Sequence, residues 1–319
     1  MSHNFCIAPM MDRTDRHCRY FHRLLTKKSF LYTEMLHVNA VLKGNTDKLL
    51  KYHADEHPLA LQLGGSDPLA LAEAATFGEE FGYNEVNLNV GCPSSKVQKG
   101  RFGAILMKEP GLVAECINKM NIATKIPITV KCRIGVDDMD QNQHLDNFVK
   151  EVSYAGCDTF IIHARKAWLN GLSPKDNREI PPLDYERVYE LKNTFPEIKF
   201  VINGGIKSID ESLRHLQFVD GVMMGREAYD NPLLLSQVDN EIYSEEKKEI
   251  SRSDILKKII PYLRNEVESG TKITHITRHL MGLFKGFDGA KDIRKYLVSL
   301  NNEINPLENF EFLLKKEIA

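Results

Sequence analysis

The sequence predicts a (β/α)8 barrel, the TIM-barrel fold, followed by a small helical region, and two observations carry this prediction. Eight short apolar runs alternate with helix-like segments over about the first 235 residues, close to the usual length of such a barrel. After Asn231 and Pro232 the strand signals stop and a helical spacing takes over. We therefore expect a catalytic barrel at residues 1–240 and a helical domain at residues 241–319. A doubly wound sheet is the alternative, but no Gly-X-Gly-X-X-Gly motif follows the first strand.

The predicted strands are short and are separated by segments with helical spacing. One expected helix covers residues 68–80, where Asp67 can cap the first turn. The spacing in that helix predicts a shared apolar face formed by Leu69, Ala72, Ala75 and Thr76. The eight strands are expected at residues 5–8, 31–35, 59–63, 85–90, 128–132, 159–163, 200–202 and 221–224.

The region after the strands begins with a charged linker at residues 244–248 and continues with three apolar faces. Pro261 lies within the first of them and predicts a kink. The faces are Leu256, Ile259, Ile260, Leu263 and Val267; then Ile276, Leu280, Leu283 and Phe284; then Ile293, Leu297 and Leu300.

Composition is that of an ordinary soluble protein, with 42% hydrophobic and 27% charged residues and no apolar run near the roughly 20 residues of a membrane span. No secretory signal is visible at the N-terminus. The six cysteines show neither a CxxC pair nor metal-ligand spacing, so we expect a cytoplasmic protein without disulfides or a metal. We also expect a monomer. A net charge of −2 means that any contact with nucleic acid depends on a local basic patch.

The segment Asn-Leu-Asn-Val-Gly-Cys-Pro at residues 87–93 holds a cysteine where a buried strand ends. Gly91 and Pro93 force a turn, so Cys92 is expected on a rigid loop. A thiol held there can donate a proton or attack a carbon. The alternative is a small buried hydrophobe, which is the more common role of a cysteine.

Polar and small residues gather at the ends of the predicted strands, where a barrel places its active site. Glycines after the seventh and eighth strands let backbone N–H groups approach an anion that Arg226 can pair with, so a phosphate-bearing ligand is expected. Lys131 and His163 suit the electron-rich pyrimidine edge of a flavin, and Gln62 can bond the same ring. These strand ends carry Ala8, Pro9, Met10, Glu34, Met35, Gln62, Asn89, Cys92, Lys131, Arg133, His163, Arg165, Asn203, Gly204, Gly205, Gly225 and Arg226.

Several of these residues also have a purely structural interpretation. A lone histidine at a strand end is more often a hydrogen-bonded structural residue than a catalyst. Lys131 alone fits a rim lysine whose charged end reaches water, and Gly204 with Gly205 fits a plain turn. Their convergence on one face of the barrel is what favours a binding site.

Over nearly its whole length, the helical C-terminus included, the sequence resembles the tRNA-dihydrouridine synthases. The resemblance rests on Ala-Pro-Met at residues 8–10, the run at residues 87–103, Lys131, His-Ala-Arg at residues 163–165, Asn-Gly-Gly at residues 203–205 and Gly-Arg at residues 225–226. Within the family, residues 15–21, 61–67, 164–174 and 177–184 are similar to the bacterial A-type branch. One departure is Ile105, where the family loop often has a small residue.

The resemblance implies an enzyme in which NADPH reduces FMN and the flavin reduces uridine 20, and sometimes 20a, in the D-loop of tRNA. Hydride would reach C6 of the uracil, Cys92 would protonate C5, and Asn89 would bond the base. The target uridine has to leave its stack to enter a barrel. The implied FMN ligands are Ala8, Pro9, Met10, Gln62, Lys131, His163, Asn203, Gly204, Gly205, Gly225 and Arg226.

Contact with tRNA is expected in two places. Lys175 and Arg178 lie on the long loop after the sixth strand, at the barrel mouth. A second basic stretch lies in the helical domain, although such runs are usually solvated helix faces. It comprises Lys272, Arg278, Lys285, Lys291, Arg294 and Lys295, of which Lys291, Arg294 and Lys295 are the expected tRNA contacts.

Two other functions stay open from the sequence. The chain fits another FMN barrel oxidoreductase that acts on a free pyrimidine or a small enone, with the helical domain as a lid or a dimer surface. It also fits a non-catalytic tRNA-binding protein, although the polar strand ends would then have no purpose.

Overall fold

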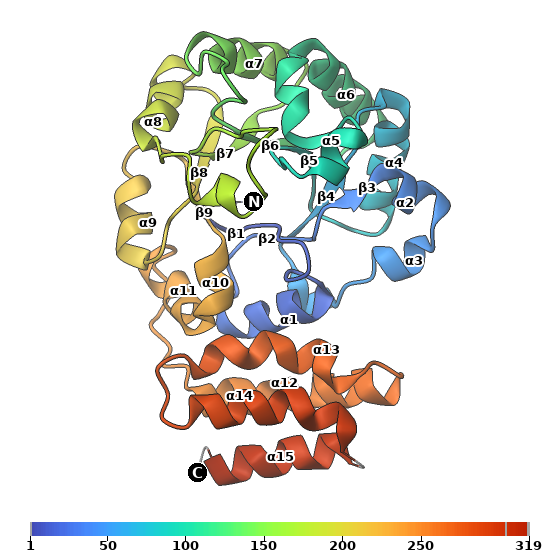
Figure 1. Cartoon of the computed structure of the whole chain (residues 1–319), viewed down its shortest axis with the longest axis vertical. Coiled ribbons are helices and arrows are strands. Elements are labelled where there is room, and N and C mark those ends of the chain that lie inside the picture. Colours follow the sequence, from blue (N-terminus) through green and yellow to red (C-terminus); the bar gives the residue numbers. More distant parts are fainter. Residues whose placement is uncertain (1, 304, 318–319) are drawn as a thin grey trace.

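A ring of parallel strands surrounded by helices forms most of the computed structural model of this chain, which describes residues 2–303 and 305–317 (Figure 1). The C-terminal helices form a separate layer below the barrel in that view. The predicted barrel and the helical C-terminal region are thus confirmed. None of the helices in this described part of the chain combines the length and apolarity that a membrane crossing requires.

Eight parallel strands follow one another in the order β1-β9-β8-β7-β6-β5-β4-β2. The two ends of this order meet where Cys6 bridges Phe30, so the sheet closes on itself. The predicted strand at residues 31–35 is wrong in length, because β2 stops at Tyr32 and a separate β3 pairs with β4. The strands are β1 Phe5–Ile7, β2 Leu31–Tyr32, β3 Leu36–His37, β4 Leu59–Gly64, β5 Glu85–Val90, β6 Ile128–Arg133, β7 Thr159–His163, β8 Lys199–Asn203 and β9 Gly221–Met224.

The barrel is surrounded by helices that connect successive strands (Figure 1). The α-helices are α1 Arg16–Leu25, α2 Val38–Lys43, α3 Thr46–Leu49, α4 Pro68–Glu80, α5 Ser95–Lys99, α6 Pro110–Ala123, α7 Gln143–Tyr154, α8 Tyr185–Thr194, α9 Ile209–His215, α10 Arg226–Asp230 and α11 Val238–Glu241. Short 3₁₀ turns are η1 Ala54–Glu56, η2 Gly103–Lys108, η3 Asp176–Arg178 and η4 Pro232–Gln237.

The helix expected at residues 68–80 forms as α4, and Asp67 caps it as predicted. Its predicted apolar face is wrong, because Leu69 is 70% exposed. The face is set by close approach to the sheet: a side chain on Gly78 would lie 2.7 Å from Val86 of β5. The residues of α4 that are buried are Leu71, Ala74, Ala75 and Gly78.

Strand side chains alternate between two cores, because successive residues of a strand point to opposite faces. Outward residues such as Leu61, Val86 and Val130 pack under the helices in the main core. Inward residues close the barrel's interior with a smaller apolar cluster of Cys6, Ala8, Phe30, Tyr32, Ala60, Ile161, Val201 and Met223. At the amino end of β5 the inward Glu85 accepts from the hydroxyls of Tyr32 and Thr129. At the carboxyl ends of β4 to β8 the inward positions are also polar, and these form the candidate site.

The C-terminal region is helical, and a segment without regular secondary structure, residues 244–251, precedes it. Pro261 lies inside α12. Of the predicted apolar faces, Leu256, Ile259, Leu263, Ile276, Leu280, Leu283, Phe284, Ile293, Leu297 and Leu300 are buried. The elements are α12 Arg252–Glu268, α13 Ile273–Thr277, η5 Arg278–Phe284, α14 Ala290–Ser299, η6 Leu300–Asn302 and α15 Pro306–Glu317.

Three consecutive residues at the start of α1 hold the helical region against the barrel. Each binds a side chain from α12 or η5, across more than 240 positions of sequence. Two of the four contacts, Arg16 with Glu266 and Arg278 with Asp15, are ion pairs, and the Glu266 side chain is 8% exposed. The partners are Arg278 and His279 for Asp15, Glu266 for Arg16, and Tyr262 for His17.

Candidate active site

The predicted site residues converge at the carboxyl ends of the strands. Neighbouring strands are in register there: Asn89 of β5 pairs with Lys131 of β6, and His163 of β7 pairs with Asn203 of β8. The Lys131 Nζ donates to Asn203 Oδ1 at 3.0 Å although β7 lies between their strands, so both side chains point into the barrel. Residues far apart in sequence therefore share one polar layer.

Cys92 lies on a loop whose backbone is held from two sides. Asn89 Oδ1 accepts from the N–H groups of Gly91 and Cys92, at 3.1 and 3.0 Å. The Cys92 carbonyl accepts from the N–H of Ala104 at 2.9 Å. Gly103 permits that contact, because it has φ +74° and a side chain there would lie 2.5 Å from the Cys92 oxygen.

Of the six cysteines, all of which are free, five are buried and Cys92 is partly exposed. The buried-hydrophobe interpretation thus fits the other five, and the fixed loop fits a reactive role for Cys92. Ile105, the departure from the family pattern, is partly buried against the main core.

Gln62 and Asn89 form a buried amide chain. Asn89 Nδ2 donates to Gln62 Oε1 at 2.9 Å, and Gln62 Nε2 donates to Asn87 Oδ1 at 2.7 Å. Gln62 is 1% exposed. The sequence did not reveal that Asn89 positions the Cys92 loop; the expected contacts of Gln62 with a flavin and of Asn89 with a uracil stay predictions.

Positive charge is concentrated beside these amides. Burial, aided by the nearby Arg133 charge, lowers the pKa of Lys131 to about 8. Burial also lowers the pKa of His163 well below its ordinary value, and the charges of Arg133 and Lys131 act in the same direction, so the imidazole is neutral at pH 7. Among the described residues no carboxylate pairs with Lys131 or Arg133. An anionic ligand would relieve this excess of positive charge.

Arg133 is a site residue whose role the sequence did not show. The residue is 3% exposed, and burial lowers the pKa of its guanidinium to about 10. It donates to the carbonyls of Gly91, Lys166 and Asn177 at 3.1, 3.1 and 2.8 Å. One side chain thus ties the Cys92 loop to the long loop after β7.

Two glycines form a cradle after β8. Gly204 and Gly205 have φ of +120° and +73°, and a side chain on Gly204 would lie 2.7 Å from the His163 ring. Tyr185, which no sequence signal marked, donates its hydroxyl to the Gly204 carbonyl at 2.6 Å. Within the described residues, the N–H groups of both glycines have no protein acceptor. A bound anion would satisfy them.

The ends of β1 and β9 adjoin this cradle. Ala8 donates its N–H to Met224 at 2.8 Å, and a side chain on Gly225 would contact the Ala8 methyl at 3.9 Å. Pro9 and Met10 follow, both half-buried, and Met10 packs on the inner apolar cluster.

Arg226, the expected phosphate partner, is bound to a carboxylate in this structure. Its Nη1 lies 2.7 Å from Glu179 Oε1, and both side chains are half-exposed. Nearby Arg165 has a buried Nε without a hydrogen-bond partner in the described residues. An unsatisfied buried donor at the mouth points to a missing acceptor.

The expected tRNA contacts are exposed but separate. Lys175 and Arg178 lie on the long loop after β7, and Lys291, Arg294 and Lys295 lie on α14. Two members of the wider basic stretch are engaged by the barrel: Arg278 pairs with Asp15, and Lys285 pairs with Glu227.

Comparisons with known proteins agree with this geometry. The model of the family described as dihydrouridine synthase (Dus) matches residues 6–319. The chain is 55% identical to the tRNA-dihydrouridine(20/20a) synthase of Yersinia pestis over 92% of this chain and 85% of that protein. Proteins of the same name from Vibrio cholerae and Escherichia coli (strain K12) are 53% and 54% identical, over 91% and 93% of this chain and 89% and 86% of theirs. The barrel mouth holds the Cys92 thiol, the cations Lys131 and Arg133, which we call the cationic layer, and the glycine cradle. The family model and these relatives show that the chain belongs to the dihydrouridine synthase family.

Proposed function

We propose that this dihydrouridine synthase reduces the C5=C6 bond of uridine 20, and of 20a, in the D-loop of tRNA, with FMN as cofactor and NADPH as reductant. The observation that carries the proposal is the placement of Cys92, the one partly exposed cysteine of the six, on a fixed loop beside the cationic layer. The names of the similar proteins support the position in tRNA. The six free cysteines support a cytoplasmic location.

The residues of the mouth fit FMN. The free N–H groups of Gly204 and Gly205, with Gly225, Arg226 and the unsatisfied Arg165 Nε, would hold its phosphate. Lys131 and His163 would face the ring, with Gln62 and Asn203 behind them and Ala8, Pro9 and Met10 at the rim. When bound, FMN supplies the hydride that C6 of the uracil receives.

Cys92 supplies the other half of the reaction. Addition across C5=C6 needs a proton at C5 once hydride has reached C6, and the Cys92 thiol donates it, leaving a thiolate that solvent reprotonates. Asn89 holds the Cys92 N–H and Arg133 holds the neighbouring Gly91 carbonyl, and we assign the bond to the base to Asn89 as well. We assign this chemistry to residues 1–240.

The substrate would be held outside the barrel by five exposed cations. Lys175 and Arg178 lie on the loop at the mouth, and Lys291, Arg294 and Lys295 lie on α14, in the segment at residues 241–319 that we assign to tRNA binding. Phosphate contacts from such side chains provide affinity without reading sequence.

Mapping dihydrouridine in tRNA from a strain that lacks this chain tests the proposal. Loss of the modification at positions 20 and 20a alone, restored by the wild-type chain, is the expected result. The purified protein should be yellow, with about one FMN per chain because the mouth offers one phosphate cradle. Unchanged tRNA, or reduction of free uridine or a small enone at the rate seen with tRNA, would favour the small-molecule alternative.

A further inference from the structure

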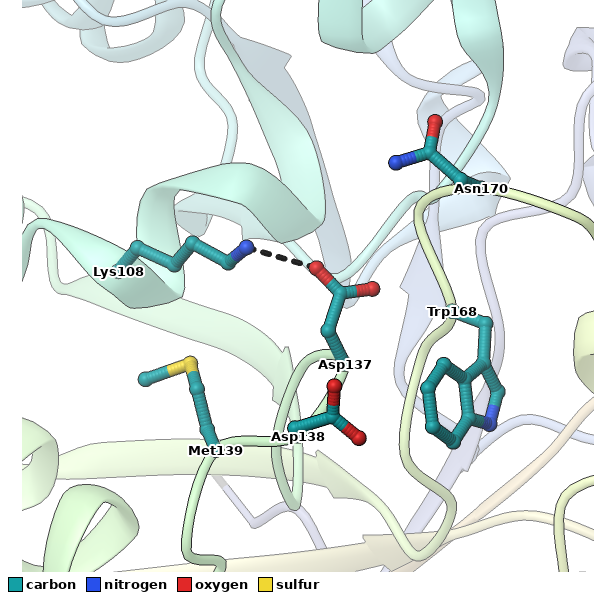
Figure 2. Close-up of a pocket in the computed structure, with 6 residues that line it drawn as sticks. All are labelled: Lys108, Asp137, Asp138, Met139, Trp168 and Asn170. Atoms are coloured by element: carbon teal, nitrogen blue, oxygen red, sulfur yellow. Dashed lines mark hydrogen bonds and ion pairs between the residues drawn. The ribbon is translucent and has the colours of Figure 1, made fainter.

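A pocket of about 480 Å³ is not used by the chemistry above (Figure 2). Gln98 connects its Trp168 side to the Cys92 loop, because Gln98 Nε2 donates to the carbonyls of Pro93 and Leu169 at 2.9 and 2.7 Å. The lining of the pocket comes from η2, which bonds the Cys92 carbonyl, and from the segments that follow β6 and β7. All three segments belong to connections that follow the carboxyl ends of β5, β6 and β7, so the pocket lies on the same side of the barrel as the site. Its size is within the range of about 300–1,000 Å³ usual for small-molecule sites. The lining residues are Lys108, Asp137, Asp138, Met139, Trp168 and Asn170.

Trp168 presents its indole ring from a backbone that is fixed by hydrogen bonds. It is the single tryptophan of the chain and is 37% exposed. Its backbone N–H donates to Asn177 Oδ1 at 2.7 Å, and its backbone carbonyl accepts from Asn177 Nδ2 at 2.8 Å. Asn177 is fully buried, and its own carbonyl binds Arg133. An exposed indole on such an anchored backbone suits the stacking of a planar base.

The pocket has two carboxylates: Asp137 already binds other groups of the protein, whereas Asp138 is exposed and available to a ligand. Asp137 accepts from the N–H of Leu169 at 2.8 Å and pairs with Lys108 at 2.7 Å. Asp138 and Asn170 are exposed, and neither side chain has a hydrogen bond or ion pair within residues 2–303 and 305–317. In the view of Figure 2 the carboxylates of Asp137 and Asp138 lie between Lys108 and Trp168.

We propose that this pocket binds an unstacked guanine base of the tRNA, next to the uridine being reduced; the inference rests on the proposed function. Asp138 selects the base. A carboxylate accepts two parallel hydrogen bonds from N1–H and the 2-amino group of guanine, whereas every other base presents an acceptor beside its donor at that edge. The negative charge of Asp138 disfavours a phosphate in the same place. Trp168 stacks on the ring, and the Asn170 amide donates to its O6.

The single tryptophan makes the pocket directly observable. Titrating tRNA transcript into the FMN-loaded protein without NADPH should quench Trp168 fluorescence with the same dissociation constant as binding measured by filter retention. Trp168→Ala should raise that constant roughly tenfold, the scale of one lost stacking contact, while Trp168→Phe should retain most of the affinity. Flavin content of each variant checks that it is folded.

Inosine, which lacks the 2-amino group, tests the carboxylate. Replacing guanosines of the D-loop by inosine one at a time should weaken binding to the wild-type protein at one position, by about tenfold, because one of the two bonds to the Asp138 carboxylate is lost. Asp138→Asn should weaken binding of normal tRNA and abolish the response to inosine. Asp140→Asn, a neighbouring exposed carboxylate outside the pocket, is the matched control and should behave as the wild type.

Three results would overturn the inference. The first is unchanged tryptophan emission on tRNA binding together with unchanged affinity of Trp168→Ala, and the second is an equal inosine response in the wild-type and Asp138→Asn proteins. The third is quenching by polylysine but not by tRNA, which would assign the pocket to a basic protein segment. In each case the wild-type protein would still form dihydrouridine. Absence of dihydrouridine with any tRNA would instead count against the proposed function, whatever the fluorescence shows.

Discussion

Cys92 owes its position to hydrogen bonds that leave the thiol itself uncommitted. The Asn89 side chain binds the N–H groups of Gly91 and Cys92, and Ala104 binds the Cys92 carbonyl. All of these contacts are to the backbone. The sulfur can therefore be replaced with little effect on the loop, which makes it a clean residue for testing the chemistry.

Cys92→Ala should leave FMN content and NADPH oxidation intact, because neither uses the thiol. Formation of dihydrouridine should fall by roughly 10²- to 10⁴-fold, the usual cost of losing a positioned general acid. Single-turnover reduction of tRNA, started from enzyme already reduced, measures the step. Cys92→Ser should recover little, since a hydroxyl is a far weaker acid. Wild-type rates for the alanine variant would make Cys92 structural and direct attention to His163 or water.

Lys131 gives the site a pH dependence. Burial, then the Arg133 charge, lower its pKa from 10.5 to about 8. Below about pH 8 the charged lysine is less stable in the fold than in the unfolded chain, and this cost disappears as the pH rises from 8 to 10.5. An anionic ligand favours the charged form. Flavin affinity of the apoprotein should therefore weaken as the pH rises through about 8, by up to about tenfold per unit.

Lys131→Met removes the titrating group and should flatten this profile between about pH 7.5 and 9, measured by flavin fluorescence quenching. Lys175→Met, on an exposed loop position, is the control and should keep the wild-type slope. Equal slopes in the wild-type and Lys131→Met proteins would place the titration elsewhere.

At the scale of residues, the sequence predicted which side chains gather at the site but not how they act. Strand ends and alternation brought Lys131, His163 and Asn203 together correctly. Arg133 was visible only as a strand-end cation, because its three partners are backbone carbonyls from loops whose paths no local pattern determines. Tyr185 gave no signal for the same reason.

The long loop between β7 and α8 contacts two arginines of the site, Arg133 and Arg226. Its start is tied to Arg133, and Glu179 pairs with Arg226 at the beginning of α10. That pair is exposed, so it contributes at most about 1 kcal/mol to stability. The pair instead affects ligand binding, because it occupies Arg226, the arginine that is expected to bind the FMN phosphate.

Glu179→Gln should therefore strengthen binding of FMN while leaving riboflavin, which has no phosphate, and the melting temperature unchanged. Isothermal titration of both ligands into apoprotein measures the difference. Glu186→Gln, an exposed carboxylate in the first turn of α8, serves as the control. A parallel gain for riboflavin would mean that the loop was loosened in general and that Arg226 was not released for phosphate.

Elements were predicted well where a buried strand is bounded by turns, as with β5 and β7, whose limits agree with the expected ones. The errors came from packing. In α4 small and apolar residues lie on more than one side of the helix, so spacing alone cannot select a face, and the approach of Gly78 to β5 decides it. The shortened β2 ends for a similar tertiary reason, since β3 takes the remaining pairing on β4.

For the whole molecule, we expect a division of roles in which the barrel mouth carries out the chemistry and α14 binds the tRNA. Reversing both charges in Arg294→Glu/Lys295→Glu should weaken tRNA binding and lower the slope of log affinity against log salt by about 2, one for each lost phosphate contact. FMN content and NADPH oxidation should not change. Lys247→Glu/Lys248→Glu, in the exposed linker, makes the same change of charge away from α14 and is the control. Equal salt slopes for the two double variants would place the RNA on another surface.

The three pairs at the start of α1 have a consequence for how one nucleotide is chosen. The helix that makes them is the first element after β1, whose end lies in the barrel mouth, so two ion pairs and a hydrogen bond, rather than the linker, hold α12 and η5 against the barrel. Because α14 packs on η5, these contacts also fix where α14 lies relative to the mouth. The enzyme thus has two proposed RNA contacts, α14 and the barrel mouth, at a fixed separation. A folded RNA bound at α14 brings to the mouth only the nucleotide that lies at this separation, so the enzyme selects its nucleotide by distance along the folded RNA.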